Sequence, residues 1–132
     1  MSVGLLIITH NDIGASLLTT ATRMLGTCPL PARALAVTED SERASLEVHA
    51  LGMAEELDMG DGVLVLTDLF GSTPANIARS LQAHPAVRVL TGVNLPMLVR
   101  VLNYPSLPLA DIAVKAESGG RDGVLLCPAY VE

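Results

Sequence analysis

The stretch VLVLTDLFGSTP (residues 63–74) decides the fold. Its first five residues form a continuous apolar run, which is typical of a strand buried on both faces of a parallel sheet. Polar residues follow at once, and Pro74 is well placed in the first turn of a helix. The stretch therefore predicts a buried strand, a polar loop at the carboxyl end of that strand, and a helix after the loop.

The same pattern recurs on both sides of this stretch. Asn11 and Asp12 are expected to cap the first helix, and Pro96 to lie in the first turn of a later one. Strands are expected at residues 3–8, 34–37, 63–67, 87–90 and 123–127. A helix is expected after each of the first four strands, including one over 38–61, and a last helix is expected over 110–117. This alternation predicts an α/β fold with an open, mostly parallel, doubly wound sheet of four parallel strands and helices on both faces.

Length and composition fit a single domain over residues 1–132. Hydrophobic residues make up 50% of the chain and charged residues 17%, which suits a packed core and excludes disorder. Two Tyr, one Phe, no Trp and a net charge of −6 argue against binding of nucleic acid. The two distant cysteines suit a reducing compartment, and no signal peptide or membrane span is found, so a cytoplasmic protein is expected.

The acidic residues are concentrated between Thr38 and Asp61. This segment contains eight of the fourteen Asp and Glu residues and one basic residue, Arg43. A solvated helix face is the ordinary interpretation of such a run, and a docking surface for a basic protein is the alternative.

Three polar clusters follow predicted strands, at residues 9–12, 67–73 and 92–94. Ligand sites of open α/β sheets lie at the carboxyl ends of strands, near a switch in strand order. If the first and third strands are neighbours, His10 and Asp68 face one crevice. A carboxylate on one imidazole nitrogen fixes the tautomer and leaves the other nitrogen as a nucleophile.

Gly71, Ser72 and Thr73 lie at the start of the next helix, where backbone N–H groups and hydroxyls are suited to hold an anion such as phosphate. This arrangement suits transfer of a phosphoryl group to and from a histidine. The alternatives are that His10 is an ordinary loop residue and that Asp68 is a helix cap. The sequence contains no P-loop, no dinucleotide-binding glycine pattern and no nucleophile elbow.

The segments IITH (7–10), TDLFGSTPAN (67–76) and GVNLPML (92–98) resemble the IIA domain of the mannose family of the bacterial phosphoenolpyruvate-dependent sugar phosphotransferase system. They occur in the order and spacing of that family, and the similarity covers essentially the whole chain. The resemblance implies a phosphotransferase subunit with a phosphohistidine at His10, oriented by Asp68. Thr73 falls where the family has a Ser that contacts the phosphoryl group.

The resemblance also implies the partners. The histidine-containing phosphocarrier protein would be the donor and a IIB protein the acceptor in sugar uptake, with at most peripheral contact to a membrane transporter. The family forms homodimers by exchange of a C-terminal antiparallel strand, here residues 124–127. No metal or organic cofactor is expected, because transfer between two histidines requires no bound nucleotide.

The chain departs from the family pattern at two positions. Asn11 replaces the usual Gly after the histidine, and Ser72 replaces the second Gly of a Gly-Gly pair. Three other functions remain open on sequence alone: a phosphocarrier for dihydroxyacetone kinase, a regulatory sensor of phosphorylation state without its own transporter, and a non-catalytic α/β domain.

Overall fold

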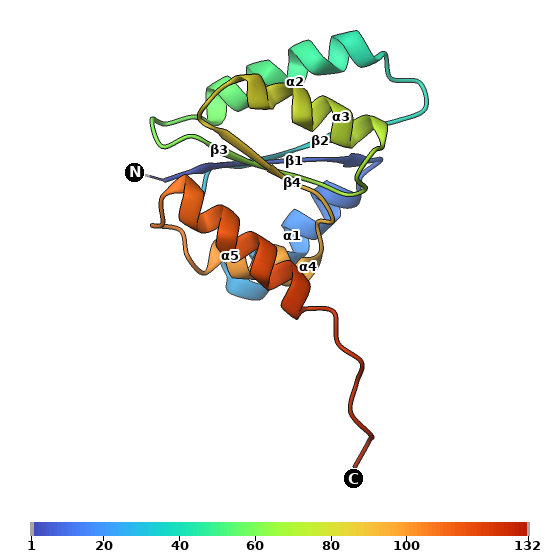
Figure 1. The fold of residues 1–132 in the computed structure, drawn as a ribbon, viewed down its shortest axis with the longest axis vertical. Coiled ribbons are helices and arrows are strands. Elements are labelled where there is room, and N and C mark those ends of the chain that lie inside the picture. The colour runs from blue at the N-terminus through green and yellow to red at the C-terminus, as the bar shows by residue number, and fades with distance from the viewer. Residues whose placement is uncertain (1, 132) are drawn as a thin grey trace.

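The sheet is four-stranded and parallel, and helices cover both of its faces (Figure 1). This is the arrangement in a computed structural model that describes residues 2–131. The strands are β1 (Gly4–His10), β2 (Ala32–Val37), β3 (Val63–Thr67) and β4 (Val87–Leu90). One face carries α2 (Arg43–Leu57), α3 (Thr73–Ser80) and η1 (Leu81–Ala83), and the other carries α1 (Ile13–Leu25), α4 (Leu95–Leu102) and α5 (Leu109–Asp122). The predicted α/β class and its four parallel strands are confirmed.

The strand order is β2-β1-β3-β4. From β1 the chain turns to β2 on one side, and it later forms β3 on the other side of β1. Ile8 of β1 lies opposite Thr67 of β3 in the parallel register. The carboxyl ends of β1 and β3 therefore meet at a switch in strand order, which is where open α/β sheets bind ligands.

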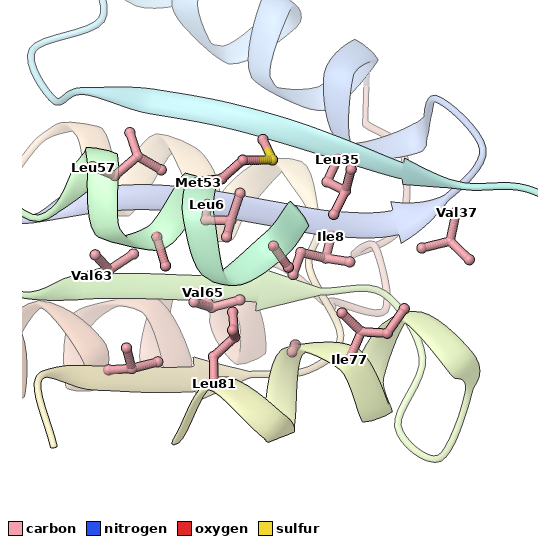
Figure 2. Close-up of a cluster of buried hydrophobic side chains, with 14 residues drawn as sticks. Leu6, Ile8, Leu35, Val37, Met53, Leu57, Val63, Val65, Ile77 and Leu81 are labelled. Atoms are coloured by element: carbon pink, nitrogen blue, oxygen red, sulfur yellow. The ribbon is translucent and has the colours of Figure 1, made fainter. Parts of the chain in front are cut away.

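Two apolar cores hold the helices on the sheet. Figure 2 shows the core under α2 and α3, where Leu6 and Ile8 of β1 and Val65 of β3 meet Met53 and Ile77 from the helices. The second core, on the opposite face, joins Leu5, Ile7, Leu64 and Leu66 of the central strands to α1, α4 and α5. Because β1 and β3 contribute to both cores, their carboxyl ends have a rigid support.

The helix expected over residues 38–61 is shorter at both ends. A turn precedes α2, in which the Thr38 N–H donates to Ser41 Oγ at 3.0 Å and the Ser41 N–H donates to the Thr38 carbonyl at 3.1 Å. After α2, Gly60 and Gly62 adopt positive φ angles of 108° and 84°. Local side-chain bonding and glycine geometry therefore override the periodic pattern at both ends.

The last helix is longer than residues 110–117, because α5 continues through Gly119 and Gly120 to Asp122. A Cβ atom at Gly119 would lie 2.5 Å from the Arg100 Cβ, and one at Gly120 would lie 2.7 Å from the Met97 Cε. The two glycines thus allow α5 to lie directly against α4. Their packing role outweighs their low helix propensity.

Residues 124–131, called the tail below, leave the end of α5 and extend away from the sheet (Figure 1). They form no helix or strand within the described chain, so the strand expected at 123–127 stays a prediction. Gly123, the first residue of that expected strand, instead caps α5 with a φ of −77°. Within residues 2–131, no helix is long and apolar enough to cross a membrane.

Candidate functional site

His10 and Asp68 are in direct contact across the neighbouring strands β1 and β3. One carboxylate oxygen, Asp68 Oδ2, lies 2.8 Å from His10 Nδ1 and accepts the His10 backbone N–H at 2.9 Å. The other, Oδ1, accepts the Leu69 N–H at 2.9 Å. Asp68 does not cap α3, whose N-cap residue is Ser72. The structure thus joins the two residues that the sequence placed at the ends of two strands, because those strands are neighbours.

The hydrogen bond to Asp68 determines the chemistry that the imidazole can perform. A carboxylate accepts hydrogen bonds and cannot donate one, so the neutral ring bonded to it carries its proton on Nδ1. Nε2 then holds the free lone pair. The His10 side chain is 44% exposed, whereas that of Asp68 is 14% exposed. The ring therefore presents a nucleophilic nitrogen on the surface while its orienting carboxylate is nearly covered.

Asp68 is ionised in this arrangement. Burial by itself would raise the pKa of this carboxyl group, but the hydrogen bond from the His10 backbone, the contact with the His10 ring and the Leu69 N–H lower it. Together they hold the pKa of Asp68 below its ordinary value of 3.8. A negative charge thus remains beside the ring at neutral pH.

The turn after His10 explains the first departure from the family pattern. Asn11 has a φ of 49°, in the left-handed region that favours glycine. Asn is one of the few other residues that adopt this region readily. The Asn11 N–H also donates to the Val37 carbonyl at 2.9 Å, which ties the turn to β2.

The side chain that caps the first helix is not the one expected from the sequence. Asp12 occupies the N-cap position of α1, but its side chain makes no capping hydrogen bond. The buried hydroxyl of Thr9 accepts the Gly14 N–H instead, at 2.8 Å. A Thr at the end of a buried strand gives no sequence signal for this role, because a capping residue ordinarily lies at the helix boundary itself.

The loop before α3 and the first residue of that helix are predicted to bind a phosphoryl group. Gly71 has a φ of 85°, which requires glycine, whereas Ser72 is extended with a φ of −83°. The second departure from the family pattern therefore does not strain the backbone. Ser72 Oγ donates to the Leu69 carbonyl at 2.6 Å, and Thr73 begins α3. The N-terminus of α3, where the first N–H groups have no partner inside the helix, thus comes shortly after Asp68 in the chain.

The third polar cluster, residues 92–94, supports the same edge of the sheet. The Gly92 N–H donates to the Asp68 carbonyl and the Val93 N–H to the Thr67 carbonyl, both at 3.0 Å. Asn94 caps α4 by accepting the Met97 N–H at 2.9 Å. This cluster therefore stabilises the backbone beside Asp68.

One buried group at the site was missed from the sequence. The Thr67 side chain, directly before Asp68, is fully buried, and its Oγ1 has no hydrogen-bond partner among residues 2–131. The apolar run predicted a buried strand here, but only the structure shows that its terminal hydroxyl is left without a partner.

The chain is similar to known proteins along most of its length. A family model described as EIIA-man, PTS system fructose IIA component, matches residues 4–113. The PTS system mannose-specific EIIAB component of Escherichia coli K12 is 32% identical over 129 residues, which is 94% of this chain and 39% of the relative. The PTS system fructose-specific EIIA component of Bacillus subtilis 168 is 35% identical over 72 residues, 53% of this chain and 49% of the relative. The chain thus spans 39% of the length of the Escherichia coli relative that it matches.

Solved structures share the fold. The mannose/sorbose specific IIA subunit of the phosphotransferase system from Enterococcus faecalis has a TM-score of 0.86 at 22% identity, covering 100% of this chain and 99% of that one. The PTS IIA protein associated with the fucose utilization operon from Streptococcus pneumoniae has a TM-score of 0.74 at 28% identity, covering 89% of this chain and 93% of that one.

Proposed function

The chain belongs to the EIIA-man family of phosphotransferase-system IIA components, and we propose that it carries a phosphoryl group on His10 Nε2. The observation that carries this proposal is the 2.8 Å contact between His10 Nδ1 and Asp68 Oδ2. It leaves the exposed Nε2 with the lone pair that a nucleophile requires.

In the proposed reaction, Nε2 attacks the phosphorus of a phosphohistidine on the donor protein. The new N–P bond forms as the donor's N–P bond breaks, and the donor imidazole leaves with the electron pair of that bond. The His10 ring keeps its proton on Nδ1 and gains a positive charge, which faces the Asp68 carboxylate. Passage of the phosphoryl group to an acceptor reverses these steps at Nε2.

Gly71, Ser72 and Thr73 are proposed to bind the phosphoryl oxygens. A doubly charged phosphoryl group is favoured near a helix N-terminus, where N–H groups lack partners inside the helix. In this proposal the α3 start stabilises the anion and Asp68 stabilises the ring, so the two charges are balanced by separate groups.

The proposed donor is the histidine-containing phosphocarrier protein, and the proposed acceptor is a IIB protein in sugar uptake in the cytoplasm. The relatives support sugar phosphotransfer, because two of them are named as mannose- and fructose-specific components. Transfer to a dihydroxyacetone kinase, or to no acceptor at all in a regulatory sensor, would be alternative results of the acceptor assay described below.

The protein is also proposed to form a homodimer by exchange of its tail. Val124, Leu125 and Leu126 are between 77% and 100% exposed. Within the described chain, β4 is an edge strand of the sheet. An apolar segment and an open strand edge are complementary, and pairing between two copies would cover both. The tail would then form an antiparallel strand on the partner's β4.

Phosphorylation in a reconstituted system tests the function. The purified chain is mixed with labelled phosphoenolpyruvate, enzyme I and the histidine-containing phosphocarrier protein, with His10→Ala and His84→Ala variants beside it. We expect acid-labile, alkali-stable label on the wild type and on His84→Ala, and none on His10→Ala. Label that persists on His10→Ala would refute the assignment of the site. Adding a IIB protein or a dihydroxyacetone kinase then identifies the acceptor.

A further inference from the structure

A pocket opens at the end of the sheet that lies farthest from His10. Its volume is about 300 Å³, and its walls come from the end of α2, η1 and the first residues of β3 and β4. Figure 2 shows Val63, which lines the pocket, at one end of the core, and Val37, which pairs with His10, at the other. The pocket is therefore separate from the site proposed to carry the phosphoryl group.

Apolar side chains form much of the wall of this pocket. They are Leu51, Ala54, Val63, Leu81 and Val87. Leu51 is 43% exposed, and the other four are buried. The volume is about twice the roughly 150 Å³ of an engineered apolar cavity that binds benzene. The pocket is thus large enough to hold the apolar part of a small organic ligand.

Two carboxylates also line the pocket, and one of them is fixed in place. Glu55 is exposed in the last turn of α2, and Asp58 is the C-cap residue of that helix. Asp58 Oδ1 accepts the N–H groups of Gly60 and Gly62 at 2.8 and 3.1 Å. These bonds hold the carboxylate and leave its Oδ2 without a hydrogen bond among residues 2–131.

The same negative charges are unfavourable for α2 itself. The carboxyl end of a helix carries a partial negative charge, and its last carbonyls have no partner inside the helix. The last turn of α2 contains no basic residue. Glu56 is paired with Arg33 at 2.8 Å, whereas Glu55 and Asp58 form no salt bridge among residues 2–131. A local conflict of this kind is expected at a functional site.

The wall of the pocket contributes no positive charge to offset these carboxylates. Of residues 2–131, those that line it include neither Lys nor Arg. His84 lines it as well, and its Nδ1 accepts the Ala86 N–H at 3.1 Å. An imidazole that accepts at Nδ1 is neutral and carries its proton on Nε2. Positive charge is therefore favoured in whatever fills the pocket.

We propose that this pocket binds a small organic cation, an ammonium group on an apolar body, with roughly ten non-hydrogen atoms in all. The ammonium pairs with the Glu55 carboxylate and with Oδ2 of Asp58. The apolar body lies against Val63 and Leu81. This binding goes beyond phosphoryl transfer and does not depend on phosphorylation of His10.

Three probes of nearly equal size test the proposal, namely 2-phenylethylammonium, the neutral 2-phenylethanol and the anionic phenylacetate. NMR of the backbone amides at neutral pH follows their binding to the full chain. We expect 2-phenylethylammonium to shift the signals of Gly60, Gly62 and His84 with a Kd of about 1 mM, and to leave that of Asn11 unchanged. 2-Phenylethanol should bind about tenfold more weakly, and phenylacetate more weakly still.

A double neutralisation, Glu55→Gln/Asp58→Asn, tests the two carboxylates. An Asn at position 58 keeps an oxygen that can accept the two glycine N–H groups of the turn. At an ionic strength of about 10 mM we expect the Kd of 2-phenylethylammonium to rise about tenfold, and by less at about 0.5 M salt. The matched double variant, Glu39→Gln/Asp40→Asn, removes the same charge at the carboxyl edge of the sheet and should bind as the wild type.

Two further variants separate the apolar wall from the fold. Leu51→Ala should raise the Kd about threefold, whereas Val48→Ala, on the same helix but outside the pocket, should leave it unchanged. Glu55→Gln should unfold in urea with a free energy at least equal to that of the wild type, because it removes a charge that disfavours the helix end. A less stable Glu55→Gln would mean that this charge serves the fold, and would overturn the inference.

Equal Kd values for 2-phenylethylammonium and 2-phenylethanol would also overturn it, as would wild-type affinity in the double neutralisation. Phosphoramidate is a small molecule whose P–N bond breaks as the His10 Nε2–P bond forms and ammonia leaves. It should label His10 in every variant at the wild-type rate, and slower labelling would mean that the substitutions disturb the sheet rather than the pocket. If the proposed function fails, the wild type takes no label on His10 but still binds 2-phenylethylammonium.

Discussion

Two regions of the molecule differ in how far the chain itself fixes them: the carboxyl edge of β1 and β3, and the tail at residues 124–131. At the edge, His10, Asp68 and Asn11 are fixed by hydrogen bonds to neighbouring strands of the same chain. In the tail, residues 124–131 are exposed and form no helix or strand within the described chain. One region is complete in a single copy, whereas the other presents apolar side chains that a single copy does not cover.

This contrast has a physical origin in what each region contacts. The edge lies above two apolar cores to which β1 and β3 both contribute, so its polar groups are positioned by rigid strands. The tail follows α5 after the last buried residue of that helix, Gly120. In the proposed dimer it pairs with β4, one of the two edge strands of the sheet. Chemistry at His10 and assembly through the tail should therefore respond to different substitutions.

Removal of the tail should have the largest effect, and only on assembly. Deletion of residues 124–132 removes the proposed exchanged strand, so we expect a dimer to become a monomer at micromolar concentration. Deletion of residues 128–132 leaves residues 124–127 in place and should leave the dimer intact. Analytical ultracentrifugation measures both, and phosphoramidate labelling of His10 should stay within about twofold of wild type. A dimer that survives the longer deletion would contradict strand exchange.

Asp68→Asn should have the next largest effect, and only on chemistry. An Asn amide can donate to Nδ1, which would place the ring proton on Nε2 and remove the nucleophile. We expect phosphorylation of His10 to slow by about a hundredfold or more. Rapid-quench labelling measures the rate, and the dimer should persist in ultracentrifugation. A rate within twofold of wild type would mean that Asp68 does not set the tautomer.

The ionised Asp68 carboxylate should also make the free energy of unfolding depend on pH in the acid range. The pKa of Asp68 is lowered in the folded chain, so its contribution to stability is present above the ordinary value of 3.8. That contribution declines as the pH falls below 3.8 and is lost below the folded-state pKa. The difference in free energy of unfolding between the wild type and Asp68→Asn should therefore shrink between pH 6 and pH 3, as followed by urea unfolding. A constant difference would contradict a lowered pKa.

The contrast between the two regions also explains what the sequence could predict. The apolar run at 63–67 and the polar residues after it predicted β3 and the loop with Asp68, because buried parallel strands carry a strong signal. The contact between His10 and Asp68 requires β1 and β3 to be neighbours. The sequence did not predict this, and the strand order of the structure shows it. The end of α5 was missed because Gly119 and Gly120 serve contacts with α4 that no local pattern encodes. The apolar run at 123–127 predicted a strand, and only the resemblance predicted its exchange between two chains, because such pairing depends on a second copy.

Two substitutions at position 11 should differ in their effect on the free energy of unfolding. Asn11→Val places a branched side chain at a φ of 49°, which should cost about 1–2 kcal/mol of unfolding free energy. Asn11→Gly should match or exceed the wild type. Ser72→Gly is the control, because Ser72 is extended and gains nothing from glycine; it should lose about 0.5–1 kcal/mol. Urea unfolding measures all three, and equal stability of Val and Gly at position 11 would contradict the left-handed turn.

The smallest effect should come from two threonines at adjacent strand ends, Thr9 and Thr67, which are both buried. The Thr9 hydroxyl accepts the Gly14 N–H, so Thr9→Val should leave that donor unpaired and cost about 1 kcal/mol. The Thr67 hydroxyl has no partner among residues 2–131, so Thr67→Val should stabilise the protein by up to about 1 kcal/mol. Thermal unfolding measures both. Destabilisation by Thr67→Val would mean that its hydroxyl is bonded, and parallel slowing of His10 phosphorylation would make it a positioning residue for the site.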